Sequence, residues 1–263
     1  MIAPDTFELH IVDHIAEIVL DRPEAYNALT FDVYQDLTKC FADLQQEQDI
    51  RVVVITGRGK AFCSGGDVRE IIGRLLEKGE EDLREFTRLT CELVWNMRSL
   101  SKPVIACLNG VTAGAGAILA IASDFRIAAE TAKIAFLFVR VGLSGADMGA
   151  CYLLPKIVGW TKATELLMTG DFISAEEAYR IGLYNRIVPL EQLSDVTMEL
   201  ATKLAAGPAN GIAVTKQQLN AETLPRLKEI LEMEGTVQAH CMLDPDFTEG
   251  YTAFLEKRQP KFR

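Results

Sequence analysis

Positive charge is scarce in this sequence of 263 residues, which carries 27 lysines and arginines against 37 aspartates and glutamates. The resulting net charge of -10 leaves no basic stripe that could neutralise a row of phosphates, so we expect no nucleic acid partner. No apolar run reaches the roughly 20 residues that span a bilayer, and the N-terminus has neither the basic nor the apolar region of a secretory signal. These absences predict a cytoplasmic protein that does not enter membranes.

Motifs for metals and nucleotides are missing as well. The six cysteines are scattered, form no C-x-x-C pair, and have no histidine at metal-ligand spacing. We therefore expect buried free thiols in a reducing compartment and no metal site. Neither G-x-x-x-x-G-K-[ST] nor G-x-G-x-x-G occurs, which argues against the use of ATP or NAD.

Strand and helix patterns alternate in the first part of the chain. Residues 7–23 alternate apolar and polar side chains over two short runs, as in a hairpin. Two continuous apolar runs, at 51–57 and 102–110, are typical of strands buried on both faces. Residues 30–48 and 116–124 have the spacing of helices. This alternation predicts β-α-β units with parallel strands.

Helical patterns dominate from about residue 160. A helix, a turn and a second helix are expected over 161–183, with Ser174 and Glu177 forming a capping box. Further helices are expected over 190–243. We therefore divide the chain into an α/β core, residues 1–190, and a C-terminal helical region, residues 191–263, whose several apolar faces favour packing on a partner subunit.

Two glycine-rich loops each follow a buried strand and precede a helix, in GRGKAFCSGGDVRE (57–70) and NGVTAGAGAIL (109–119). A helix that starts after such a turn points backbone N–H groups at a ligand and favours negative charge there. Two converging N–H donors form an oxyanion hole, which stabilises a thioester enolate or a tetrahedral adduct. Either loop alone is also compatible with a simple turn.

The chain resembles the crotonase superfamily, the enoyl-CoA hydratase/isomerase family, nearly end to end. The segments that carry the resemblance include LDRPEAYNALT, VVVITGRGKAFCSGGDVRE, KPVIACLNGVTAGAGAILAIASDFRIAAETAKIAF, ELLMTGDFISAEEAYRIGLYNRIVP and EGYTAFLEKRQPKF. The resemblance implies an α/β fold, a crotonase-like spiral of β-β-α units with a C-terminal helical trimerisation region. It also implies a homotrimer or a dimer of trimers. The implied substrate is an acyl-CoA thioester, with coenzyme A as part of the substrate and no separate cofactor.

The same resemblance implies which residues bind the thioester. The N–H groups of Gly66 and Ala115 would be the oxyanion donors. The adenine and pantetheine of coenzyme A would be lined by Glu24, Ala25, Ala61, Phe62, Cys63 and Ser64. Lys257 and Lys261 lie in a tail that would reach a neighbour's CoA phosphates, although a solvated basic terminus is the alternative.

One departure from the family pattern bears on the reaction. Family hydratases use two glutamates to handle water, and here those positions hold Ile118 and Phe138, which cannot move a proton. Asp147 is the best remaining acid or base, with a register that fits other family members only approximately and with helix capping as its alternative role. Glu92 is a second candidate, on a helix that borders the acyl pocket in the family, unless it simply faces solvent.

These observations favour an enoyl-CoA isomerase or an atypical hydratase. The same oxyanion hole would also serve thioester hydrolysis, decarboxylation or ring cleavage. A third hypothesis, motivated by the two missing glutamates, is a non-catalytic acyl-CoA binder.

Overall fold

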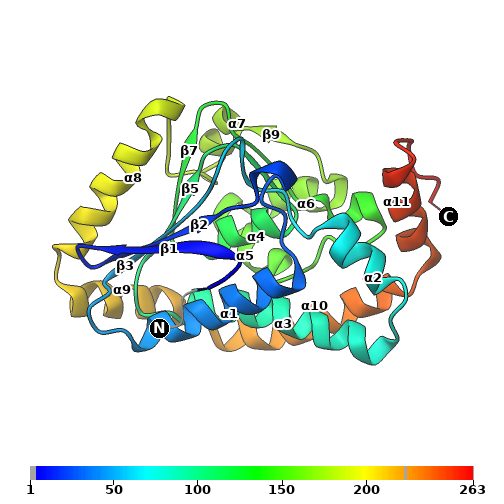
Figure 1. Ribbon diagram of the computed structural model, residues 1–263, viewed down its shortest axis with the longest axis horizontal. Helices are drawn as coiled ribbons and strands as arrows, with labels where there is room; N and C mark the ends of the chain where they lie inside the picture. The colour runs from blue at the N-terminus through cyan, green and yellow to red at the C-terminus, as the bar shows by residue number, and fades with distance from the viewer. Residues whose placement is uncertain (1–3, 222–223, 263) are drawn as a thin grey trace.

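Two sheets form the body of the molecule in the computed structural model, which describes residues 4–221 and 224–262 (Figure 1). The larger sheet has the strand order β1-β2-β3-β5-β7-β10 and the smaller sheet β4-β6-β8-β9. All neighbours are parallel except the β1–β2 and β8–β9 pairs. The strands of the larger sheet are β1 Phe7–Val12, β2 Ile15–Leu20, β3 Val52–Gly57, β5 Val104–Leu108, β7 Phe125–Ala129 and β10 Arg186–Val188. Those of the smaller sheet are β4 Ala61–Cys63, β6 Val111–Ala113, β8 Lys133–Ala135 and β9 Ile173–Ser174.

A β-β-α unit repeats three times along the core. In each unit the first strand joins the larger sheet, the second joins the smaller sheet, and a helix follows. The three helices are α3 (Glu80–Ser99), α4 (Ala115–Ala122) and α5 (Ala150–Val158). Short helical turns precede two of them, namely η2 (Val68–Ile72) with α2 (Gly73–Leu75), and η3 (Leu137–Val141). The predicted spiral of β-β-α units is thereby confirmed.

The apolar runs of the sequence account for the larger sheet. Val52, Val53, Val54 and Ile55 are all buried, because α8 (Leu190–Ala205) packs on the sheet that they help to build. The hairpin expected at the N-terminus is the β1–β2 pair. The helix expected over 30–48 is α1 (Phe31–Gln46), and its N-cap Thr30 accepts the N–H of Val33.

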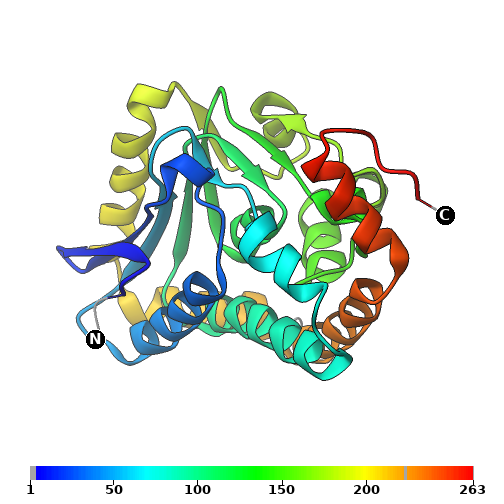
Figure 2. The same cartoon turned by 45° about the vertical axis from the view of Figure 1, so that its right-hand side comes forward.

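The C-terminal helices pack on the core of their own chain. α9 (Ala209–Ala221) is followed by α10 (Leu224–Met242), which lies along α3, and by α11 (Pro245–Leu255), which contacts η3 (Figures 1 and 2). The helix pair expected over 161–183 is present as α6 (Trp160–Thr169) and α7 (Ala175–Arg180), with Ser174 capping the second helix. The predicted division between residues 190 and 191 lies at the start of α8 (Leu190–Ala205), one residue into the helix. No helix in the described part of the chain is both long and apolar enough to cross a bilayer.

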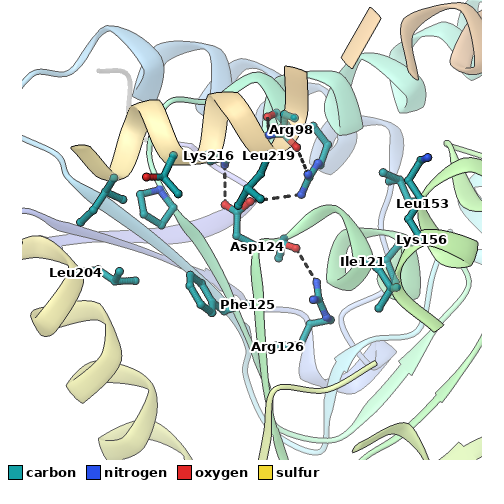
Figure 3. Close-up of a pocket in the computed structure, with 16 residues that line it drawn as sticks. Arg98, Ile121, Asp124, Phe125, Arg126, Leu153, Lys156, Leu204, Lys216 and Leu219 are labelled. Carbon is teal, nitrogen blue, oxygen red and sulfur yellow. Dashed lines mark hydrogen bonds and ion pairs between the residues drawn. The ribbon is translucent and has the colours of Figure 1, made fainter. Parts of the chain in front are cut away.

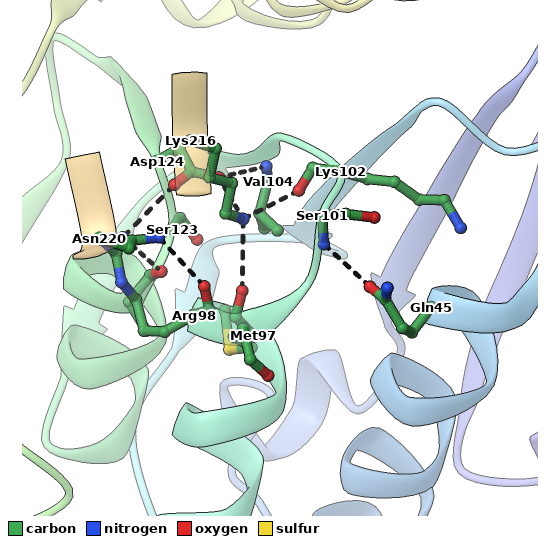
Figure 4. Close-up of polar contacts among 12 residues, drawn as sticks. Gln45, Met97, Arg98, Ser101, Lys102, Val104, Ser123, Asp124, Lys216 and Asn220 are labelled. Carbon is green, nitrogen blue, oxygen red and sulfur yellow. Dashed lines mark hydrogen bonds and ion pairs between the residues drawn. The ribbon is translucent and has the colours of Figure 1, made fainter. Parts of the chain in front are cut away.

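Asp124 ties α9 to the core through a buried ion network (Figure 4). Its carboxylate lies 2.7 Å from the ammonium of Lys216 and 3.4 Å from the guanidinium of Arg98, and it accepts the N–H of Val104. Lys216 also donates to the carbonyl of Lys102 at 2.8 Å. Burial lowers the pKa of Lys216, and the charge of Asp124 opposes that shift and favours the protonated lysine.

We expect Asp124→Asn to lower the free energy of unfolding by about 3 kcal/mol, because the amide leaves two cations without their counter-charge. The amide oxygen still accepts the N–H of Val104, so the effect isolates the ion pairs. Urea denaturation measures the change. The matched control is Asp82→Asn, which breaks the exposed pair with Lys78 and should cost less than about 1 kcal/mol. Equal losses in the two variants would contradict this account.

Candidate active site

The two glycine-rich loops lie against each other. They follow β4 and β6, which are neighbours in the smaller sheet, so parallel pairing brings their ends together. A Cβ at Gly65, whose φ is +103°, would lie 3.1 Å from the carbonyl oxygen of Ala113 and 3.4 Å from the nitrogen of Ala115. Gly114 also has a positive φ, +51°. Only glycine fits such an approach of one backbone to the other.

Gly66 in the first loop and Ala115 in the second are among the residues whose backbone N–H has no acceptor in the described part of the chain. In the first loop Leu29 accepts the N–H of Asp67 and donates its own N–H to the carbonyl of Gly65. This pairing skips Gly66, whose N–H makes no bond to Leu29. In the second loop Ala115 is the first residue of α4, where no intrahelical acceptor exists for its N–H. The structure therefore provides two unused donors on adjacent loops, one of them at a helix N-terminus.

The segment expected to line coenzyme A is assembled from two distant parts of the chain. Asn27 donates to the carbonyl of Ala61 at 2.8 Å, and Ser64 donates its N–H to the carbonyl of Tyr26 at 3.0 Å. These bonds bring Glu24 and Ala25 next to the predicted residues 61–64. The side chains of Ala61, Phe62 and Cys63 are buried in the core, so only their backbone and Ser64 can face a ligand.

Apolar side chains occupy the two positions at which family hydratases were expected to have glutamates. Ile118 is fully buried in α4 and Phe138 is buried in η3. No proton-transferring group stands at either position, so any acid or base must come from elsewhere.

Asp147 lies in the loop between η3 and α5 and is buried, with 7% of its surface exposed. Its Oδ1 has no partner among the described residues. Burial raises the pKa of Asp147 to about 7, although Gln238 and the N–H of Met148 oppose the shift. The alternative role as a helix cap is wrong, because α5 has Gly149 at its N-cap and no side chain caps it. A carboxyl with this pKa can both give and take a proton near neutral pH.

Tyr34 lies next to the first loop. Its hydroxyl lies 3.9 Å from the point where a Cβ of Gly66 would stand. Burial raises the pKa of Tyr34 well above its usual value, and the nearby Cys63 and Asp147 add to the shift. The tyrosine was not singled out in the sequence, where it occupies an apolar position of a helix.

Glu92, the second candidate acid, is not brought to the loops. It is exposed in a groove of about 580 Å³ between α3 and α10, together with Arg88 and Glu232. Its neighbour Cys91 points inward and donates to the carbonyl of Leu231. Burial raises the pKa of the Cys91 thiol, which keeps it protonated.

The basic tail is folded back on α11. Lys257 is exposed just beyond that helix, and the N–H of Lys261 donates to Glu249 at 2.6 Å. The expected contact with a neighbour's CoA phosphates stays a prediction. Arg140, near the second missing glutamate, pairs with Asp171 rather than with Asp147.

A separate cavity of about 540 Å³ opens at the other end of α4 from Ala115 (Figure 3). Three cationic side chains that line this cavity already have partners. Arg98 and Lys216 pair with Asp124. Arg126 donates to backbone carbonyls. These cations are not available to an anionic ligand. Within residues 4–221 and 224–262, no three His, Cys, Asp or Glu side chains gather in a way that could hold a metal ion.

Comparison with known proteins identifies the class to which this fold and these loops belong. The sequence profile described as enoyl-CoA hydratase/isomerase matches residues 10–263. The chain therefore belongs to the enoyl-CoA hydratase/isomerase family, whose members act on CoA thioesters, and it is an enzyme of the hydratase/isomerase type.

Similar proteins of this family carry more than one reaction in their names. The chain is 34% identical over 253 residues to 1,2-epoxyphenylacetyl-CoA isomerase of Escherichia coli (strain K12), covering 96% of each chain. It is 34% identical to (E)-benzylidenesuccinyl-CoA hydratase of Thauera aromatica, covering 97% of this chain and 98% of the other. The crystal structure of an enoyl-CoA hydratase from Mycobacterium avium subsp. paratuberculosis K-10 superposes with a TM-score of 0.88 at 29% identity, covering 98% of both chains.

Proposed function

We propose that this enzyme isomerises an enoyl-CoA thioester by moving one proton between two carbons of the acyl chain. The observation that carries the proposal is the buried carboxyl of Asp147, whose charge acts on the buried Tyr34 next to Gly66, in a site where Ile118 and Phe138 replace the acids that handle water. One carboxyl is sufficient for a reaction in which the proton removed is later returned. Isomerases occur among the similar proteins, which supports this direction.

The proposed reaction uses the two unused N–H groups as an oxyanion hole. Gly66 and Ala115 would donate to the thioester oxygen and stabilise the negative charge that develops there. The carboxylate of Asp147 takes a proton from C2 of a 3-enoyl thioester, and the electron pair of that C–H bond delocalises onto the oxygen as a dienolate. The carboxylic acid then gives the proton to C4, and the double bond ends between C2 and C3. No water is consumed.

We also propose that the enzyme assembles as a homotrimer or a dimer of trimers through its C-terminal helices. The proposal is supported by the resemblance to the family and by the exposed apolar side chains of Leu219 on α9 and Met233 on α10, 76% and 54% exposed, which a subunit interface would cover. Light scattering after gel filtration measures the assembly. A monomer at micromolar concentration would overturn this part of the proposal.

A thioester panel in deuterated water tests the reaction. We expect a 3-enoyl-CoA to become the 2-enoyl isomer with no added water and with little deuterium on the chain, because Asp147 returns the proton that it removed, when the products are separated and weighed by mass spectrometry. Addition of one water would instead identify a hydratase, free coenzyme A a hydrolase, and loss of carbon dioxide a decarboxylase. Binding by calorimetry without any product would identify a silent acyl-CoA binder.

A further inference from the structure

Helix α10 contacts both ends of the loop that carries Asp147. The side-chain oxygen of Gln238 accepts the N–H of Ser144 at 3.0 Å, where the loop begins. The carboxylate of Glu234 accepts the N–H of Gly149 at 2.6 Å, where the loop ends and α5 starts. Residues four apart lie on the same face of a helix, so one face of α10 fixes the whole loop.

Three polar atoms in this cluster are buried and have no partner among the described residues. They are Oε1 of Glu234, Nε2 of Gln238 and Oδ1 of Asp147. Glu234 and Gln238 are 1% and 0% exposed. Buried polar groups are nearly always hydrogen-bonded, and a cluster of exceptions weakens a fold unless it serves another purpose.

The two carboxyls influence each other. Burial raises the pKa of Glu234 to about 7, the N–H of Gly149 opposes the shift, and the charge of Asp147 adds to it. Such an effect is reciprocal, so an ionised Glu234 also discourages ionisation of Asp147. The other titratable groups that face Asp147 are Tyr34 of α1, Cys91 of α3 and Cys241 of α10, whose pKa values are all raised chiefly by burial. Cys151 of α5 faces Glu234, and burial raises its pKa to about 11. These four groups stay neutral near pH 7.

We propose that Glu234 and Gln238 are positioning residues for Asp147: they hold both ends of its loop and face its carboxyl with one acid and one amide. The inference rests on the proposed role of Asp147 as the acid and base. It assigns to the C-terminal helical region a part in the active site of its own chain. The acid and the amide act in opposite directions: the negative charge of Glu234 disfavours the carboxylate of Asp147, and the nearby amide of Gln238, although its nitrogen makes no hydrogen bond in the described residues, favours it.

The pH profile of kcat/KM tests this opposition. Glu234→Gln keeps an acceptor for the N–H of Gly149 and removes the negative charge. The acidic limb of the profile, where activity falls as Asp147 is protonated, should therefore move to lower pH by about 0.5–1 unit. Gln238→Met keeps the size and removes the amide, so the limb should move up by a similar amount. A purely structural role would lower activity at every pH without moving the limb. Glu232→Gln, at an exposed acid two residues from Glu234, is the matched control and should leave the profile unchanged.

A titration without substrate separates this inference from the proposed function. In protein labelled with ¹³C at aspartate and glutamate carboxyls, the Asp147 signal, assigned by its absence in Asp147→Asn, should titrate lower in Glu234→Gln and higher in Gln238→Met. If neither the titration of Asp147 nor the acidic limb of the pH profile shifts in these variants, the positioning role is overturned. An inactive Asp147→Asn would still uphold the proposed function in that case. An active Asp147→Asn would reject the proposed function, and the NMR shifts would then decide the coupling alone.

Discussion

Asp147→Asn is expected to lower kcat for enoyl-CoA isomerisation by about 10³-fold, because the amide can neither take the C2 proton nor return it. Binding of the thioester should change little, since Gly66, Ala115 and the CoA-lining segment are untouched. Steady-state kinetics with a 3-enoyl-CoA and calorimetry with a saturated acyl-CoA measure the two effects.

Glu92→Gln distinguishes the two candidate acids of the sequence. Glu92 is exposed between α3 and α10, so its amide variant should keep full turnover. Turnover that survives in Asp147→Asn and disappears in Glu92→Gln would contradict the assignment.

The same Asp147 variant should be more stable than the parent protein in alkaline solution. The pKa of Asp147 is raised to about 7 in the folded state, so the folded protein binds more protons than the unfolded chain between about pH 4 and 7. The stability from this group is complete below that window and is lost as the pH rises through 7. Asparagine avoids the loss, and we expect a gain on the order of 2 kcal/mol at pH 8 and little or none at pH 4. Urea denaturation at both pH values checks this sign.

The fold was predictable where local sequence determines local structure. The run that became β5 is apolar throughout and that of β3 is apolar except for Thr56, because both faces of these strands are covered, and α1 follows its 3.6-residue period. The strands of the smaller sheet were not identified, since β4, β6 and β8 have three residues each and β9 has two, too few to show any period.

The site was predictable only in part, for a related reason. Gly65 and Gly114 mark their loops in the sequence, because backbone positions with positive φ angles favour glycine. Glu234 and Gln238 lie almost 90 residues beyond Asp147, and only packing brings them to it. A signal did exist, because the two residues continue a buried stripe of α10 that starts with Leu227 and Leu231. Polar residues on such an apolar stripe mark a cluster that burial alone does not explain.

Ala115→Pro is expected to lower kcat by about 10²–10³-fold, because it deletes one of the two N–H groups of the proposed oxyanion hole. Ala115 is the first residue of α4, a position where proline fits a helix and where the N–H has no helical role. The substitution therefore removes the donor with little disturbance of the fold, which circular dichroism and thermal melting verify. KM should change less than kcat, since the charge on the thioester oxygen is largest in the transition state.

Ala115→Val is the matched control, because valine is close to proline in size and keeps the N–H. Ala115 is buried, so each substitution adds carbon atoms to a packed position, valine at Cβ and proline between Cβ and the nitrogen, and only the proline loses the donor. We expect valine to retain most of the turnover at a modest cost in stability. Equal losses of kcat in the two variants would attribute the effect to crowding and would contradict a role for this amide. A proline variant with full turnover would remove Ala115 from the oxyanion hole and would contradict the proposed pair of donors.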